Sequence, residues 1–201
     1  MTFKTLEIWN CKGVESLAEI NLDSLWSLEE IIIQNCEDLR SLPQCLHRLS
    51  HLSFLLLAQC PSLELECFPP LPLGISSFCL YECLKIKSLP NQLHQIIYLR
   101  HLEILGCKSI TCFPRGGLPP QLQRLEVRGR KKMKHPVREW LTPLTSLQYL
   151  SIDDSAGGLG EAEDLMLLFP SSLIHLHMCD MRNVERLSSS LPPSLRTLEI
   201  Q

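Results

Sequence analysis

Three residues near the C-terminal end of the chain have side chains that could bind a metal ion. His175, His177 and Cys179 alternate in the segment HLHMC, and alternate residues of a strand point to the same face of a sheet. Imidazole nitrogen and thiolate sulfur are ligands that zinc accepts. Neighbouring side chains on one face lie about 7 Å apart, however, and the sequence supplies no evident fourth ligand. We therefore expect exposed histidines and no metal site on this strand.

Motifs of enzymatic chemistry are not evident elsewhere. No Ser/His/Asp or Cys/His set can be singled out from spacing, and paired carboxylates appear only in the acidic segment DDSAGGLGEAED, residues 153–164. The glycines of that segment are not followed by lysine, and the phosphate loop G-x-x-x-x-G-K-[ST] does not occur. We therefore predict a protein that is not an enzyme and uses no cofactor.

A basic segment complements the acidic one. RGRKKMKHPVR, residues 128–138, carries six Lys and Arg residues, and residues 153–164 carry five Asp and Glu residues. A basic run can indicate nucleic-acid binding, but this run has no aromatic residue on which a base could stack. We favour solvated loops that partly neutralise each other, with docking to a charged protein domain as the second interpretation. Nucleic acid is the least favoured partner.

Bulk properties of the chain point to the cell interior. The formal net charge of −3 for 201 residues gives no reason to expect nucleic acid or an anionic membrane as a partner. The first residues lack the basic region and apolar core of a signal peptide, and no apolar run reaches the roughly 18 residues of a membrane span. We expect a cytoplasmic protein, in which the ten cysteines stay reduced.

The dominant feature is an internal repeat, which the segment LRHLEILGC, residues 99–107, represents well. The leucine places of the template L-x-x-L-x-L-x-x-(N/C), with any aliphatic residue, Phe or Met allowed there, are matched nine times, with spacings of 22 to 26 residues. This period is typical of leucine-rich repeats. We predict an α/β repeat fold, a leucine-rich-repeat solenoid shaped like a horseshoe, with one strand per repeat in a parallel concave sheet. The nine repeats, one domain over residues 1–201, start near residues 3, 28, 52, 75, 99, 122, 147, 173 and 195.

Cysteine recurs at the ninth place of the first five repeats, where the chain leaves the strand and turns. A small side chain that tolerates burial and donates a weak hydrogen bond suits that corner. Stacked repeats would bring these thiols about 4.8 Å apart, but a reducing cytosol argues against disulfides. We predict a structural ladder of free thiols, with metal or redox use as the alternative: Cys11, Cys36, Cys60, Cys83 and Cys107.

The return segments on the convex side are of two kinds. Repeats starting at 28, 52, 99 and 147 are entered by L-x-x-L-x-x-L, as in Leu46, Leu49 and Leu52, a spacing that favours a helical or 3₁₀ turn. Repeats starting at 75, 122, 173 and 195 are entered by P-x-x-L, which we expect to be extended or polyproline-like. The convex face should therefore be irregular and mostly loop or 3₁₀ turn.

Side chains that flank the two strand leucines should be exposed on the concave face and could bind a protein. An apolar and aromatic stripe precedes a charged group there, and exposed aromatic residues beside arginine are favoured at protein interfaces. The alternative is that a lost N-terminal domain, or a flattened strand geometry, covers the stripe. The candidate contact residues are Trp9, Ile32, Phe54, Leu56, Tyr81, His101, Glu103, Leu105, Arg124, Glu126, Arg128 and Tyr149.

The repeats resemble a known family. LEILGCKSI, the SLP endings and the entry LPPSLRTLEI are similar to the C-terminal leucine-rich repeats of plant intracellular disease resistance proteins of the coiled-coil, nucleotide-binding type (NB-LRR). The similarity weakens in repeats six to eight, where Arg130, Ser155 and Met181 replace the ninth-place cysteine. We therefore expect less regular curvature there.

The resemblance implies a role in plant defence. In that family the repeats recognise a pathogen effector or a modified host protein, and they restrain the receptor's own nucleotide-binding domain. The alternative function is a stand-alone repeat adaptor, such as the substrate-binding module of a ubiquitin ligase. Because the chain begins and stops inside a repeat, we expect a fragment or the product of a truncated gene, with incomplete ends.

Overall fold

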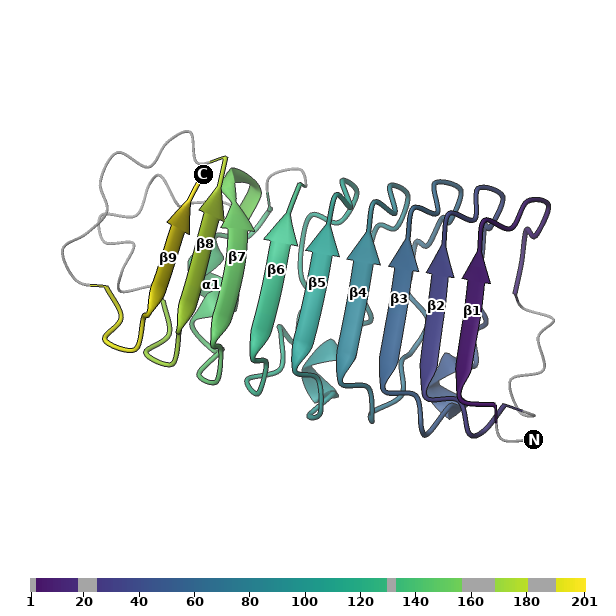
Figure 1. Cartoon of the computed structure of the whole chain (residues 1–201), viewed down its shortest axis with the longest axis horizontal. Helices are drawn as coiled ribbons and strands as arrows, with labels where there is room; N and C mark the ends of the chain where they lie inside the picture. The colour runs from purple at the N-terminus through teal and green to yellow at the C-terminus, as the bar shows by residue number, and fades with distance from the viewer. Residues whose placement is uncertain (1–2, 18–24, 130–132, 157–168, 181–190) are drawn as a thin grey trace.

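The computed structural model describes residues 3–17, 25–129, 133–156, 169–180 and 191–201. These residues form a nine-stranded parallel sheet in which each strand pairs with the next along the chain (Figure 1). The strands are β1 (Thr5–Trp9), β2 (Glu30–Gln34), β3 (Phe54–Ala58), β4 (Ser77–Tyr81), β5 (His101–Leu105), β6 (Arg124–Arg128), β7 (Tyr149–Asp153), β8 (His175–Cys179) and β9 (Thr197–Ile200). Every strand begins two residues after a predicted repeat start, so the repeat pattern predicted the solenoid and its parallel sheet.

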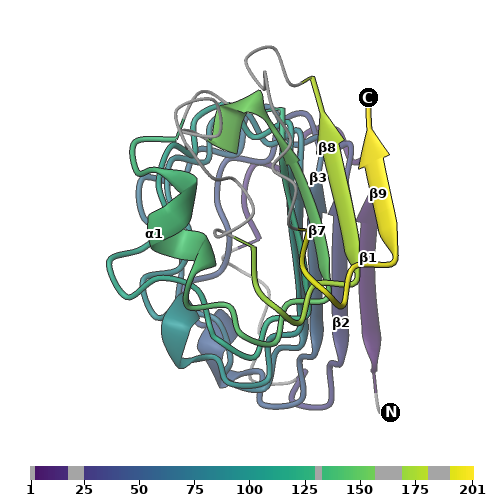
Figure 2. The same cartoon turned by 90° about the vertical axis from the view of Figure 1, so that its left-hand side faces the viewer.

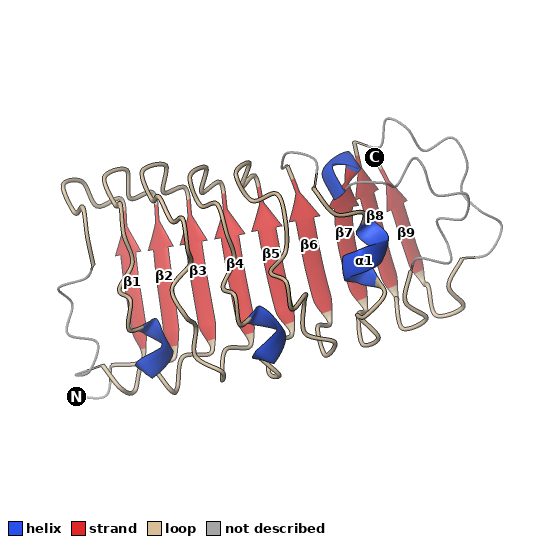
Figure 3. Cartoon of the chain, turned by 180° about the vertical axis from the view of Figure 1, so that it is seen from behind, coloured by secondary structure: helices blue, strands red, loops and turns tan. Residues whose placement is uncertain are grey.

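The sheet forms one layer of the molecule and the return segments form the other. In a view along the solenoid, β1 and β9 lie farther out than the middle strands, on the side of the sheet that faces away from the return segments (Figure 2). This face of the sheet is therefore concave. The return segments cover the opposite face, as the view from behind shows (Figure 3). The predicted division into a concave sheet and an irregular convex side is therefore confirmed.

The core lies between the two layers and is built from the leucine positions of the repeat. The first residue of each central repeat is fully buried, as Leu52, Ile75 and Leu99 are. Strand residues at the fourth and sixth places point to the same side, and Phe78 of β4 stacks edge-on against Phe68 with ring centroids 5.2 Å apart. Burial of apolar area is the main force that stacks the repeats, because a single repeat cannot cover its own hydrophobic face.

Short helices occur on the convex side where the L-x-x-L-x-x-L pattern predicted them. Two are 3₁₀ turns, η2 (Leu46–Arg48) and η3 (Leu93–Gln95). Before β7 the same pattern follows a short α-helix, α1 (Val137–Leu141), which buries Trp140 against Phe113 with ring centroids 5.2 Å apart. Part of the pattern before β2 lies outside the described residues.

The prediction for the proline entries was wrong. In each P-x-x-L segment the N–H of the fourth residue donates to the proline carbonyl, for example Ile75 to Pro72 at 3.3 Å and Leu195 to Pro192 at 2.9 Å. The leucine entries close the same turn, with Leu52 donating to Leu49 at 3.0 Å. Proline lacks a donor but keeps its acceptor carbonyl, so it can occupy the first position of this turn as well as leucine does.

The ninth-place cysteines lie in a row where the strands end. The described cysteines are all free, and four of this row are buried: Cys36, Cys60, Cys83 and Cys107. Their Sγ atoms lie near backbone carbonyls, 3.3 Å from Ala58 O for Cys60 and 3.6 Å from Leu57 O for Cys83. The hydrogen bond with Cys60 and burial hold the pKa of Cys83 well above its usual range. Cys83 therefore stays a neutral thiol, which suits a weak donor to backbone oxygen.

In the seventh repeat, a side-chain carboxylate takes the place of the backbone carbonyl that accepts a hydrogen bond at the end of the strand in other repeats. In repeats one to five the N–H of the eighth residue donates to the seventh-place carbonyl of the next strand, as Gly106 does to Arg128 at 2.9 Å. Gly129 instead donates to the side chain of Asp153, which also accepts the N–H of Ser155 at 3.0 Å and the Ser155 hydroxyl. The backbone pairing of β6 with β7 accordingly ends one residue early, at Val127 and Ile152.

Candidate functional site

Three rows of side chains run across the concave face, because neighbouring strands pair in register. The first row passes through Phe54, Ser77, His101 and Arg124, and the second through Ile32, Leu56, Cys79 and Glu103. The third row contains Trp9, Ala58, Tyr81, Leu105 and Arg128. The predicted contact residues therefore do share one surface.

The half of this face that β1 to β5 form carries a group of apolar side chains among polar ones such as Glu7 and Glu30. Trp9 is 55% exposed, and the other members are partly exposed: Ile32, Phe54, Leu56, Tyr81 and Leu105. We call these six residues the apolar patch. Ala58 and Cys79 lie between them but are buried, and burial raises the pKa of Cys79 to about 11. Because Ala58 and Cys79 are small, the larger side chains beside them form the concave surface here.

A network of hydrogen bonds and ion pairs joins β4 to β6 beside the apolar patch. Tyr81 donates its hydroxyl to Glu103, and Arg124 Nε donates to the second oxygen of Glu103 at 3.1 Å. Arg124 also binds Glu126, which accepts from Arg128 Nη2 at 3.1 Å. Burial and the Glu103 hydrogen bond hold the pKa of Tyr81 well above its usual range, so its phenol stays a donor. The two negative charges of the glutamates and the two positive charges of the arginines therefore cancel within the network.

Glu126 departs from the expectation of an exposed contact residue, which was wrong. It is only 5% exposed, because the guanidinium groups of Arg124 and Arg128 cover it from two sides. A buried carboxylate requires such pairing. Glu126 therefore positions two arginines instead of offering its own charge to a partner.

A shallow pocket of about 420 Å³ opens over the first row between β5 and β8. We call it the donor pocket; its lining residues are His101, Gln123, Arg124, Gln148, Tyr149, Ile174 and His175. The Arg124 guanidinium lies 3.8 Å from the centre of the Tyr149 ring, a cation–π contact that fixes both groups. The sequence pattern identified His101, Arg124 and Tyr149 but missed Gln123 and Gln148. These glutamines occupy the second place of the repeat, just before the strand.

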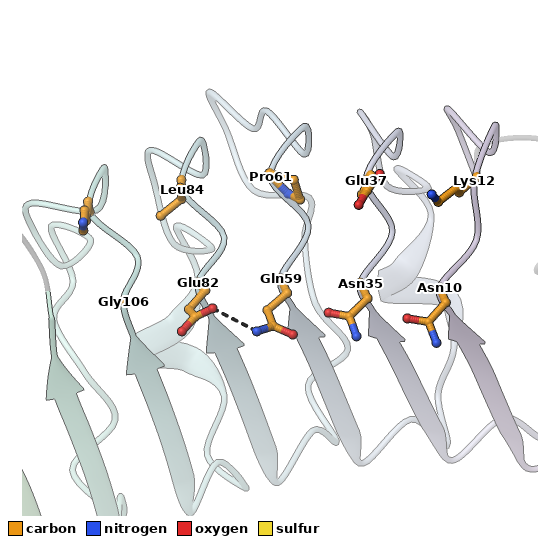
Figure 4. A pocket seen from close by; sticks show the side chains of 10 residues that line it. Asn10, Lys12, Asn35, Glu37, Gln59, Pro61, Glu82, Leu84 and Gly106 are labelled. Carbon is orange, nitrogen blue, oxygen red and sulfur yellow. Dashed lines mark hydrogen bonds between the residues drawn. The ribbon is translucent and has the colours of Figure 1, made fainter.

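A second groove, of about 630 Å³, follows the edge at which β1 to β5 end (Figure 4). Its floor is formed by eighth-place residues with left-handed backbone, with φ of 54° at Asn10, 53° at Asn35 and 67° at Gly106. Asn and Gly adopt this conformation more readily than other residues. Gln59 donates to Glu82, its neighbour along the floor of the groove, at 3.0 Å. The recurring Asn and Gly at the eighth place was the available sign of this groove, and our sequence interpretation did not use it.

The candidate zinc residues lie along β8 as expected of a strand. His175 is exposed and Cys179 is buried, with its Sγ 3.7 Å from Arg128 Nη1. Within the described ranges no group of three His, Cys, Asp or Glu side chains is placed to hold a metal ion. Most of the acidic segment and part of the basic one lie outside the described residues. Over the described part of the chain, no helix is long and apolar enough to cross a membrane.

Comparisons with known proteins define the class of fold. No family model and no curated protein matches the sequence. Among solved structures, the chain is similar to the internalin InlF of Listeria monocytogenes, with TM-score 0.54 and 17% identity over 98% of this chain and 60% of that one. It is also similar to YopM, a leucine-rich effector protein of Yersinia pestis, with TM-score 0.51 and 23% identity over 87% of this chain and 49% of that one.

YopM of Yersinia enterocolitica gives the same result, with TM-score 0.50 and 20% identity over 88% of this chain and 38% of that one. The chain spans less than two thirds of each of these proteins. Together with the repeat period and the sheet, the similarities show that the chain has the leucine-rich-repeat fold.

Proposed function

We propose that the chain is a non-catalytic recognition module that binds a protein through its concave face. The observation that carries this proposal is the apolar patch, which ordered strands present to solvent beside a set of fixed arginines. Monomeric proteins rarely expose contiguous apolar patches larger than a few hundred Å² unless the patch binds something. Aromatic residues and arginine are the types that contribute most to protein interfaces.

We further propose that the module belongs to a cytoplasmic plant immune receptor of the NB-LRR type. The supporting observation is the similarity of LEILGCKSI and LPPSLRTLEI to the repeats of that family. The partner would then be a pathogen effector, a modified host protein or the receptor's own nucleotide-binding domain.

Photo-crosslinking in plant leaf cells tests both parts of the proposal. The crosslinking amino acid benzoylphenylalanine would replace Phe54 in the apolar patch or, as a matched control, Tyr98, which is 57% exposed in the turn before β5. We expect position 54 to yield a discrete crosslinked protein and position 98 to yield none. An adduct from position 98 alone would refute binding through the concave face.

The identity of the crosslinked protein, determined by mass spectrometry, tests the finer proposal. A nucleotide-binding domain or a pathogen protein is the expected result. A subunit of a ubiquitin ligase together with its substrate would instead establish the adaptor function.

A further inference from the structure

We propose that the donor pocket receives an acidic side chain, Asp or Glu, of the protein partner. This inference rests on the proposed function and specifies the chemistry of the partner. It concerns a site next to the apolar patch, so one partner segment could fill both.

The lining of the donor pocket offers hydrogen-bond donors that no described residue uses. Arg124 employs Nε and Nη2 on the glutamates, which leaves Nη1 available. His101 Nδ1 lies 3.2 Å from Ser77 Oγ; when Nδ1 accepts the Ser77 hydroxyl, Nε2 carries the ring proton and is left as a donor. The amide groups of Gln123 and Gln148 form no side-chain hydrogen bond with the described residues. A carboxylate accepts several donors at once, and guanidinium is its strongest partner among side chains.

The charge distribution is also compatible with an acidic ligand. Among the described residues, no carboxylate lines the donor pocket, whereas Glu37 and Glu82 line the groove at the strand ends. Glu103 lies beside the pocket, but the charges of the two glutamates and two arginines in the network sum to zero, so the network does not repel a carboxylate. The contacts of Arg124 with Tyr149 and Glu103 hold the guanidinium in place before any ligand arrives, which reduces the entropy lost on binding.

The position of the pocket relative to Phe54 specifies the spacing in the partner. Phe54 and Arg124 belong to the same row and are separated by three strand steps, or about 14 Å. An extended chain covers about 14 Å in four or five residues. We therefore expect a partner segment with an apolar side chain and, four or five residues away, Asp or Glu.

A displayed library of random dodecapeptides, selected on the whole chain, is the probe that tests this inference. Peptides that lose binding to the Leu56→Asp variant occupy the concave face, and only these are analysed. We expect them to be enriched in Asp or Glu at the stated spacing from an apolar residue. Replacing that acidic residue by its amide should weaken binding about tenfold, the effect of losing a charged hydrogen-bond partner.

The decisive variant is Gln148→Glu, which puts a carboxylate into the donor pocket without removing a contact. It should weaken binding of these peptides about tenfold. The matched change Gln95→Glu, at an exposed residue of η3 on the convex side, should leave binding within about twofold. The amide form of each peptide should bind Gln148→Glu and the natural chain equally well.

Concave-face peptides without acidic enrichment, bound equally by Gln148→Glu, would overturn this inference and leave the proposed function standing. Recovery of no concave-face peptide would count against both.

Discussion

Replacing Phe78 by alanine is expected to lower the free energy of unfolding by about 3 to 5 kcal/mol, the usual cost of removing a large aromatic ring from a core. Phe78 is fully buried on the inner side of β4 and packs edge-on against Phe68. Because each repeat contacts only its neighbours, the vacated space also weakens the stacking of β3 and β5 on β4. Guanidinium unfolding followed by circular dichroism measures the change.

Phe54→Ala is the matched control for this prediction. Phe54 lies on the neighbouring strand, paired with Ser77, and its ring is on the concave face. Its loss should cost less than about 1 kcal/mol, because little packing is removed. Equal losses for the two variants would show that the concave ring belongs to the core, and the apolar patch would then not be a binding surface.

Asp153→Ala is expected to destabilise the chain by about 2 to 4 kcal/mol, because two backbone donors would lose their acceptor in a site that water does not reach well. Asp153 is only 8% exposed and accepts the N–H groups of Gly129 and Ser155. Asp153→Asn should have an intermediate effect, because one of the two accepting oxygens becomes a donor. Thermal and denaturant unfolding measure both variants, and amide hydrogen exchange at Gly129 should become faster.

The adjacent Asp154 provides the control, because its carboxylate has no hydrogen bond with the described residues. Asp154→Ala should change the free energy of unfolding by no more than about 0.5 kcal/mol. A stable Asp153→Ala variant with unchanged exchange at Gly129 would mean that the carboxylate does not replace the missing backbone bond between β6 and β7.

Much of the fold could be predicted because the same strand and turn recur in every repeat of the sequence. Once one copy such as LRHLEILGC is assigned to a strand and a turn, stacking puts every other copy in register. The rows through Phe54, Leu56 and Leu105 follow from that register alone. The apolar patch was therefore visible in the sequence.

The remaining features depend on particular side-chain and backbone contacts that the repeat period does not encode. The burial of Glu126 depends on two arginines, one on either side of it on β6. The replacement of a backbone bond by Asp153 depends on its distance from Gly129, the residue after the previous strand. The proline entries form turns because the carbonyl of Pro72, not its missing N–H, is the group that the turn uses.

The most direct test of recognition through the concave face is a comparison of two equivalent substitutions. The protein crosslinked at position 54 would be titrated by calorimetry against the natural chain, Leu56→Asp and Leu73→Asp. Leu56 lies in the apolar patch, and Leu73 is 58% exposed in the turn before β4. All three proteins should first show the same melting temperature.

We predict that Leu56→Asp weakens binding at least about 100-fold, as expected for a charge placed in the centre of an interface. Leu73→Asp should leave the affinity within about threefold of the natural chain. Unchanged affinity for Leu56→Asp, together with loss of binding in Leu73→Asp, would contradict recognition through the concave face. The interface would then lie at the edge of the solenoid near Leu73.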